Sequence, residues 1–229
     1  MVLNLDLFSK LYKELPQLWG CDDIKLKQVC DELMSQEDFY EVVSGFVKNK
    51  NRVLDLCCGK PEKIREIASH CLDCKFIGID INPGMGRYYC GENLTFSVGD
   101  ISKPLKIETD GVVALHACGD LADRSLEISL QLDAPLLVVP CCYAKIGAGI
   151  NRPISRLFSN LNMRDSYSTL IRSAKRLENS PVNSRYIAKI IRALFNYDRM
   201  ARAEEVGRKA RLIEIKDLNS PHNLAVVVN

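Results

Sequence analysis

The sequence lacks the glycine patterns of the common phosphate-binding loops. A dinucleotide loop follows the order G-x-G-x-x-G and a nucleoside-triphosphate loop follows G-x-x-x-x-G-K-[ST], and none of the 13 glycines completes either pattern. These absences weigh against NAD and ATP as ligands. The sequence also contains no apolar run approaching the ~20 residues that cross a bilayer, so no membrane partner is expected.

Signals for secretion and for a complete zinc site are missing as well. The first residues, M-V-L-N-L-D, carry no basic stretch and include an early acid, so we expect no secretory signal. Ten cysteines are then expected to be thiols in a reducing compartment, the cytosol. Cys71 and Cys74 have the spacing of half a zinc site without a second half, so no metal is expected. A weaker alternative gathers other residues at one sheet edge around a metal: Cys57, Cys58, His116, Cys118, Cys141 and Cys142.

The stretch Arg52 to Glu62 predicts a strand, a tight turn and the start of a helix. Val53 and Leu54 suit a buried parallel strand, which ends in Asp55 and small residues up to Gly59. Pro61 is typical of the first position of a helix. This order opens the ligand site of doubly wound α/β domains. An acid followed by a short turn, with no phosphate loop, favours S-adenosylmethionine as the cofactor.

Two further predicted strands also end in aspartate, at Asp80 and Asp100. Buried carboxylates cost free energy unless they have partners, so core packing does not explain the repetition. We expect Asp80 to accept hydrogen bonds from ribose hydroxyls, and Asp100 and Ile101 to meet an adenine. The predicted cofactor-binding residues are Asp55, Cys57, Cys58, Gly59, Lys60, Asp80, Ile81, Asp100, Ile101 and His116.

The order of predicted elements gives the fold class, α/β. Residues 1–50 show helical spacing and are expected to form an N-terminal helical layer. Residues 51–229 are expected to form a Rossmann-like, seven-stranded, mostly parallel sheet with an antiparallel last strand. Residues 151–210 are predicted to be a basic helical insertion before the last two strands. Residues 152–211 contain eleven arginines, three lysines and five acidic residues, which gives this segment a charge of +9 in a chain whose net charge is +2. This asymmetry is typical of a surface that binds a polyanion.

Two stretches carry a family resemblance. Leu115-His116-Ala117-Cys118-Gly119-Asp120-Leu121 and Cys141-Cys142-Tyr143 resemble the methyltransferase domain of certain eukaryotic methyltransferase-like proteins. Some of these were once labelled as containing an rRNA adenine dimethylase domain. The first stretch is distantly similar to tRNA 2′-O-methyltransferases, which carry Lys-His-Leu-Cys-Gly there. The resemblance covers roughly residues 50–229 and implies a class I methyltransferase with an RNA or ribosome-associated substrate. Its relatives usually have glycine where this sequence has Cys57 and Pro61.

Candidate catalytic residues follow from the two expected strand ends. His116 has an ordinary pKa near ~6.5, which suits a general base, although it could instead pack against the cofactor. The [Asn/Asp]-Pro-Pro-[Tyr/Phe] stretch of exocyclic amino methylation is absent. Cys118 and Cys141 occupy the positions of paired catalytic cysteines in cytosine-C5 enzymes, a minor alternative. The predicted catalytic residues are His116, Cys142 and Tyr143; the predicted substrate-binding residues are Lys145, Arg152, Arg172 and Arg192.

The predicted function is therefore S-adenosylmethionine-dependent methylation, with RNA as the acceptor. One alternative acceptor is a protein, such as a ribosomal one. A second alternative is a domain that has lost catalysis and only binds RNA or another partner. The methylated atom and the oligomeric state stay open.

Overall fold

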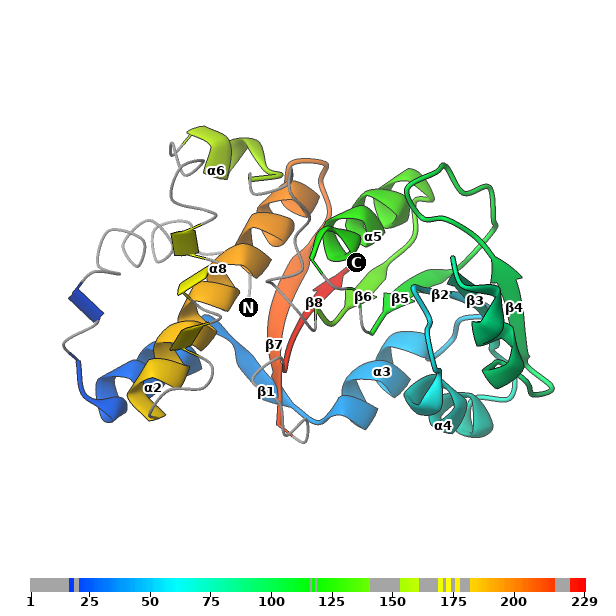
Figure 1. The fold of residues 1–229 in the computed structure, drawn as a ribbon, viewed down its shortest axis with the longest axis horizontal. Helices are drawn as coiled ribbons and strands as arrows, with labels where there is room; N and C mark the ends of the chain where they lie inside the picture. Colours follow the sequence, from blue (N-terminus) through cyan, green and yellow to red (C-terminus); the bar gives the residue numbers. More distant parts are fainter. Residues whose placement is uncertain are drawn as a thin grey trace.

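The computed structural model describes residues 17–18, 21–115, 117, 119–140, 153–160, 169–170, 172–173, 176–177, 182–216 and 223–229. An eight-stranded sheet runs through the molecule in the order β1-β7-β8-β6-β5-β2-β3-β4 (Figure 1). The strands are β1 (Ser35–Glu37), β2 (Arg52–Leu56), β3 (Lys75–Asp80), β4 (Leu94–Val98), β5 (Gly111–Ala114), β6 (Leu136–Val138), β7 (Ala210–Ile215) and β8 (Leu224–Val228). The helices are α2 (Asp23–Leu33), α3 (Phe39–Val47), α4 (Glu62–His70), the 3₁₀ helix η1 (Pro83–Tyr88), α5 (Asp120–Gln131), α6 (Arg156–Asn160) and α8 (Val182–Glu204).

The sheet is parallel except at β8. Strand β8 pairs antiparallel with both β6 and β7, whereas the other neighbouring strands are parallel. The carboxyl ends of all strands but β8 therefore lie at one edge, where open α/β sheets bind ligands. The prediction of an α/β fold with a mostly parallel sheet and an antiparallel last strand is confirmed.

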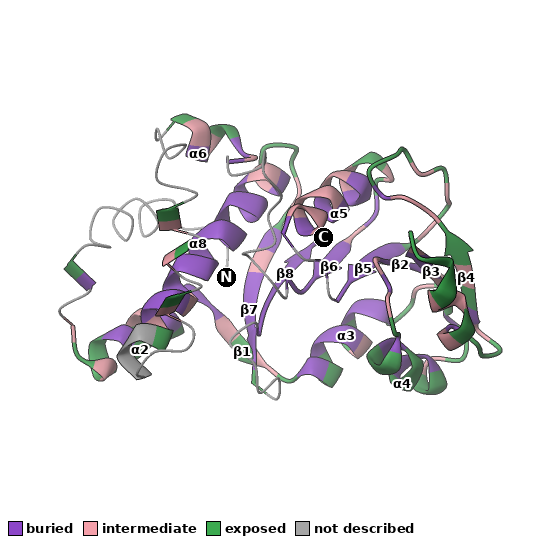
Figure 2. Cartoon of the chain, in the orientation of Figure 1, coloured by how far each residue is buried: buried purple, intermediate pink, exposed green. Residues whose placement is uncertain are grey.

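Helices cover both faces of the sheet. Val53, Val113 and Leu137 point to one face and pack with buried residues of α3 and α4. Leu54, Val112 and Leu136 point to the other face, against α2, α5 and α8. The strands between the layers and the inward sides of the helices are buried (Figure 2). A parallel strand covered on both faces needs apolar residues at nearly every position, which explains the run Val53-Leu54 before Asp55.

The first fifty residues differ from the prediction, because residues Ser35–Glu37 form a strand. Strand β1 pairs parallel with β7, with Ser35 opposite Ile213. The Lys216 N–H donates to the Glu37 carbonyl at 3.0 Å, and Arg211 forms an ion pair with Glu37. The strand is set by contacts with a distant segment and not by its own three polar residues. The sheet therefore has eight strands instead of seven, and this segment belongs to it.

The predicted basic insertion contains α6 and α8, and α8 is a covering helix of the sheet. Its apolar stripe is buried, with Ile187, Ile191 and Leu194 at most 3% exposed. The helix packs on α2, β7 and β8. The apolar stripe that predicted the helix thus packs α8 into the core. The described part of the segment is therefore part of the fold and does not extend away from it.

Candidate functional site

The turn after β2 has the backbone conformation that a ligand loop needs. Cys57 and Gly59 have φ angles of 54° and 48°, in the left-handed region where glycine is favoured. The Gly59 N–H donates to Oδ2 of Asp80 at 3.1 Å, and the Cys58 N–H donates to the Ile79 carbonyl at 3.1 Å. These two bonds hold the turn against the end of β3. Because Cys57 carries a side chain at a positive φ, the turn contains local strain.

Asp55 lies beneath this turn as a buried carboxyl group. Its side chain is 2% exposed, and the Tyr89 hydroxyl donates to its Oδ2 at 3.2 Å. Burial raises the pKa of Asp55 to about 8; the bond from Tyr89 opposes the rise, and repulsion from Asp80 adds to it. Tyr89 fits here only because position 78 is glycine, where a Cβ would lie 2.7 Å from its ring.

Asp80 and Asp100 are half-buried at the ends of β3 and β4. Oδ1 of Asp80 accepts from the Asn82 N–H at 2.9 Å, and Oδ1 of Asp100 accepts from the Ser102 N–H at 2.9 Å. The bonds with Ser102 hold the pKa of Asp100 below its ordinary value. An ionised carboxylate offers about four acceptor positions, so both groups keep acceptor capacity for a ligand. The structure thus places three carboxylates at one edge, as expected.

Two of the predicted cofactor residues are largely buried. Cys58 is 6% exposed, and its N–H is bonded to Ile79, but it also lines the cleft beside the turn. Ile101 is 5% exposed and belongs to the core that includes Leu54 and Leu56. The contact of either residue with a cofactor stays a prediction. Ile81, after β3, is 69% exposed and Val98, at the end of β4, is 58% exposed, so both apolar side chains at this edge are open to a planar ring.

Lys60 is exposed beside residues that the sequence prediction missed. Its Nζ lies 5.4 Å from the centroid of the Tyr88 ring, and the Arg87 guanidinium lies 4.7 Å from the same centroid. A small cleft opens next to the turn and is lined by Asp55, Lys60, Ile64 and Leu115, among others. Arg87, Tyr88 and Tyr89 follow a turn signal, Asn82-Pro83-Gly84, but no sequence pattern links them to the strand Arg52–Leu56.

Two other hollows lie away from the carboxyl edge. One is lined by residues at the beginnings of β2 and β3, including Arg52 and Lys75. The other lies between α3 and β7 and includes Phe46 and Arg211. Neither contains the three aspartates, so the candidate site is the turn and its cleft.

Most of the predicted catalytic and acceptor residues lie outside the part of the chain that the structure describes. They are His116, Cys118, Cys141, Cys142, Tyr143, Lys145 and Arg152. The described strands β5 and β6 are neighbours, with Ala114 opposite Val138 in the register. These strands end two to four residues before His116 and Cys142. Their roles stay predictions.

The prediction that Arg192 contacts the substrate is wrong. Its side chain is 1% exposed on the buried face of α8, so it does not reach the surface where a phosphate would approach. Arg172 is exposed, as a substrate contact requires. The sequence could not separate these two arginines, because charge alone does not show which side of a helix faces the core.

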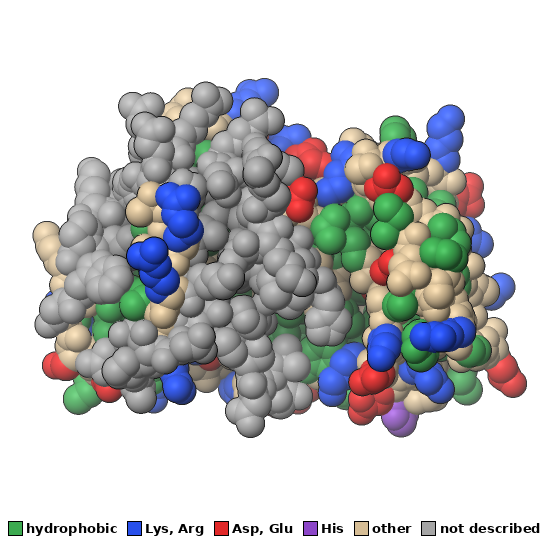
Figure 3. Space-filling view, viewed as in Figure 1, with side chains coloured by type: hydrophobic (Ala, Val, Ile, Leu, Met, Phe, Trp, Pro, Cys, Tyr) green, Lys and Arg blue, Asp and Glu red, His purple; other side chains and the backbone are tan. Residues whose placement is uncertain are grey.

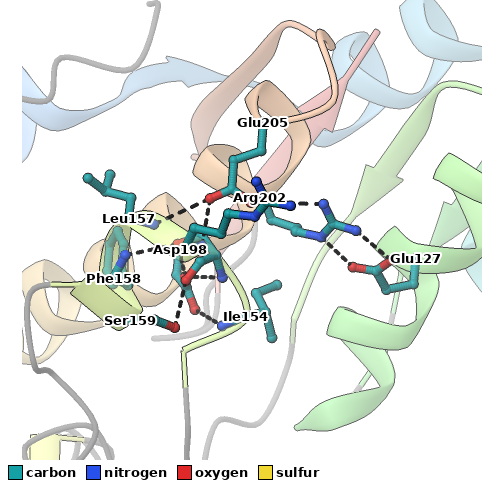
Figure 4. A network of polar contacts seen from close by, with 10 residues as sticks. Glu127, Ile154, Leu157, Phe158, Ser159, Asp198, Arg202 and Glu205 are labelled. Carbon is teal, nitrogen blue, oxygen red and sulfur yellow. Dashed lines mark hydrogen bonds and ion pairs between the residues drawn. The ribbon is translucent and has the colours of Figure 1, made fainter.

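Several other cations of the predicted polyanion surface bind carboxylates of the protein itself. Arg199 Nε lies 2.7 Å from Oδ1 of Asp123, and Arg202 binds both oxygens of Glu127 at 2.8 and 3.2 Å. Figure 4 shows the second of these pairs. The remaining pairs of this kind are Lys189 with Glu214, Arg208 with Asp133, and Arg211 with Glu37. These five pairs use five carboxylates from outside residues 152–211, so they balance five of the nine excess positive charges.

The residues that the structure describes show neither a metal-binding cluster nor a membrane-spanning helix. Among the described residues, no group of three or more His, Cys, Asp or Glu side chains is arranged to hold a metal ion. Across the same residues, no helix has the length and apolar character of a membrane span.

Comparisons with known proteins place the chain in a family. A family profile described as "Methyltransferase domain" matches residues 25–149. Two curated relatives, both described as "Glutathione S-transferase C-terminal domain-containing protein", match over 119 residues: the Bos taurus protein at 34% identity and the Homo sapiens protein at 32%. The match covers 50% of this chain and 19% of each relative, so the chain spans about a fifth of their length.

One of the solved structures that the chain matches is the plantazolicin methyltransferase BpumL, crystallised with a pentazolic desmethylPZN analog and S-adenosylhomocysteine. It is 12% identical, has a TM-score of 0.45, and the match covers 97% of this chain and 93% of that chain. The family profile matches more than half of the chain. The chain therefore belongs to the methyltransferase domain family, which agrees with the predicted enzyme class.

Proposed function

We propose that this chain binds S-adenosylmethionine at the carboxyl ends of β2, β3 and β4 and transfers its methyl group to an RNA. One observation carries the donor part of the proposal. Asp55, Asp80 and Asp100 end three adjacent strands around a left-handed turn, in a chain of the methyltransferase domain family. Such an edge suits a ligand that has an ammonium, ribose hydroxyls and an adenine amino group but no phosphate.

Each carboxylate has a role that its surroundings support. Bound S-adenosylmethionine would supply a methyl group activated by its sulfonium. Asp80, already ordered by Gly59 and Asn82, would accept from the ribose hydroxyls. Asp100 stays ionised because its pKa is lowered, and it would accept from the adenine amino group. With its raised pKa, Asp55 is mostly protonated at neutral pH, and a nearby ammonium would favour its ionised form.

The acceptor side of the proposal rests on residues after β5 and β6. His116 is proposed as a base or as a wall of the donor site, and Cys142 and Tyr143 as the border of the acceptor. Methyl transfer is an in-line displacement, so a base contributes only where the nucleophile carries a proton. The distant similarity to tRNA 2′-O-methyltransferases supports a hydroxyl acceptor, and the absence of the [Asn/Asp]-Pro-Pro-[Tyr/Phe] stretch counts against an exocyclic amine.

The RNA part of the proposal is supported by the cations that stay exposed. Arg156, Arg172, Arg176 and Arg185 are exposed, and arginine binds phosphate with two parallel hydrogen bonds. Lys145 and Arg152 are proposed to join them. A reducing compartment, the cytosol, is proposed from the free thiols of Cys30, Cys58 and Cys74.

The test of this proposal is methyl transfer from radiolabelled S-adenosylmethionine to bulk RNA and, separately, to bulk protein. We expect label in RNA, and we expect Asp80→Asn to abolish it while Lys75→Gln, an exposed change at the opposite sheet edge, leaves it unchanged. Label in protein alone would replace RNA by a protein acceptor. No label in either fraction would contradict catalysis and favour a domain that only binds a partner.

A further inference from the structure

Lys60, Arg87 and Tyr88 form a cluster at the rim of the donor turn. Lys60 directly follows Gly59, and Arg87 and Tyr88 end the 3₁₀ helix η1. The two segments follow adjacent parallel strands and are tied together by the bond from Gly59 to Asp80. Since both cations lie over one ring, at 5.4 and 4.7 Å from its centroid, their charged groups are at most about 10 Å apart.

The cluster stands on a fixed base. The next residue, Tyr89, is 4% exposed and bonded to Asp55, and its N–H donates to the Gly86 carbonyl at 3.1 Å. Gly86 itself lies so near the Phe96 ring that a Cβ would be 2.8 Å away. Cation–π contact restricts the two long side chains further. A ligand that binds them therefore loses less side-chain entropy than it would with free surface cations.

In the described part of the chain, the positive charges of Lys60 and Arg87 are not paired with carboxylates. Both side chains are exposed. This differs from Arg199 and Arg202 on α8, which are bound to Asp123 and Glu127. Contact with an aromatic ring orients a cation without neutralising it.

From this geometry we infer that Lys60 and Arg87, held on Tyr88, form a phosphate-binding subsite for the acceptor RNA next to the donor turn. The inference rests on the proposed function and adds where the RNA strand lies. The fork of an arginine beside a lysine matches a backbone phosphate. An RNA strand anchored there would run along the rim of the donor turn, on the side of η1.

The test uses a fluorescent single-stranded oligoribonucleotide of mixed sequence and fluorescence anisotropy at several salt concentrations. Arg87→Gln is expected to weaken binding about 3- to 10-fold at 0.1 M salt. It should also reduce the slope of log affinity against log salt by about 0.7, because one phosphate contact is lost. Lys60→Gln should weaken the oligoribonucleotide similarly. The matched control, Lys75→Gln, removes an exposed cation at the opposite sheet edge and should change neither quantity.

The binding of S-adenosylhomocysteine separates this inference from the proposed function. We expect Arg87→Gln to keep the wild-type affinity for S-adenosylhomocysteine while it loses RNA affinity. If Arg87→Gln lost S-adenosylhomocysteine affinity and kept RNA affinity, the cluster would hold the donor's carboxylate and the inference would be wrong. Equal losses for Arg87→Gln and Lys75→Gln, or no loss for either, would also overturn it. A wild-type protein that binds no S-adenosylhomocysteine would instead contradict the donor site.

Discussion

Along α8, arginines meet carboxylates of α5, whereas the cations at the donor turn meet an aromatic ring and solvent. Arg199 and Arg202 lie within hydrogen-bond distance of Asp123 and Glu127. Lys60 and Arg87 are exposed on Tyr88. Figure 3 shows Lys and Arg side chains exposed over the β2–β4 end of the molecule, on one of its faces. The more basic segment of the sequence is thus the one that uses more of its charge for folding.

A large effect on stability is expected at the buried carboxylate of Asp198 on α8. It accepts hydrogen bonds from the N–H groups of Ile154 and Ser155, at 2.9 and 3.0 Å, and from the Ser155 hydroxyl at 2.6 Å. Figure 4 shows it between α6 and α8. Asp198→Ala leaves buried donors without their acceptor and should lower the free energy of unfolding by about 3 to 5 kcal/mol. Urea denaturation measures this.

Asp198→Asn is the matched control, because the amide keeps one acceptor oxygen. It should cost less than the alanine change. If Asp198→Ala cost less than about 1 kcal/mol, the donors would have other acceptors and α8 would not anchor this segment.

At the donor end, the buried carboxyl group of Asp55 predicts that the stability of the folded protein falls as the pH rises. Its folded pKa, about 8, lies above the ordinary value of 3.8, so the folded state holds the proton more tightly than the unfolded state. This contribution to stability is complete below about pH 4 and is lost as the pH rises to about 8, by at most about 6 kcal/mol. Asp55→Asn has no such titration.

Urea denaturation of the wild-type protein and Asp55→Asn at pH 5, 7 and 9 measures the difference. We expect the variant to gain stability relative to the wild type as the pH rises. A difference that is constant from pH 5 to 9 would show that Asp55 is ionised in the folded protein throughout this range.

These two carboxyl groups show what the sequence could and could not predict. The run of apolar residues before Asp55 predicted a strand, and helical spacing at Ile187, Ile191 and Leu194 predicted a helix, because both patterns are local. The bond from Tyr89 to Asp55 spans 34 residues, and the bond from Ser155 to Asp198 spans 43. Local patterns carry no information about such partners.

The same limit explains the errors at charged residues. No local pattern indicates that Arg192 is buried while Arg172 is exposed, or that β1 pairs with β7. Each of these outcomes depends on which distant segment packs against the residue. By contrast, the edge of the sheet that carries Asp55, Asp80 and Asp100 could be predicted, because strand direction in a parallel sheet fixes it.

Arg202→Gln sharpens the contrast between paired and exposed cations. Arg202 and Glu127 form a half-buried pair with two hydrogen bonds, so the change should lower the free energy of unfolding by about 1 to 2 kcal/mol. It should leave the affinity for the oligoribonucleotide unchanged. The control Arg172→Gln, at an exposed position, should change stability by less than about 0.5 kcal/mol. A loss of RNA affinity in Arg202→Gln would show that α8 meets RNA directly.

The smallest expected effect is relief of strain in the donor turn. Cys57 has a φ of 54°, so Cys57→Gly should raise the free energy of unfolding by about 0.5 to 1 kcal/mol after the entropy cost of glycine. Asn49→Gly, at an exposed position with a φ of 62° in the turn before β2, is the control for strain relief alone. A stability loss in Cys57→Gly would mean that the thiol makes contacts worth more than the strain.

The most direct test of the donor site is a melting curve with S-adenosylhomocysteine, with NAD as the control ligand. Ligand at ~100 times its dissociation constant stabilises a protein by about 2.7 kcal/mol. For a chain of this size that is a rise in Tm of roughly 5 to 10 °C. The account predicts this rise with S-adenosylhomocysteine, its loss in Asp80→Asn, and no rise with NAD. No shift with S-adenosylhomocysteine, or an equal shift with NAD, would contradict it.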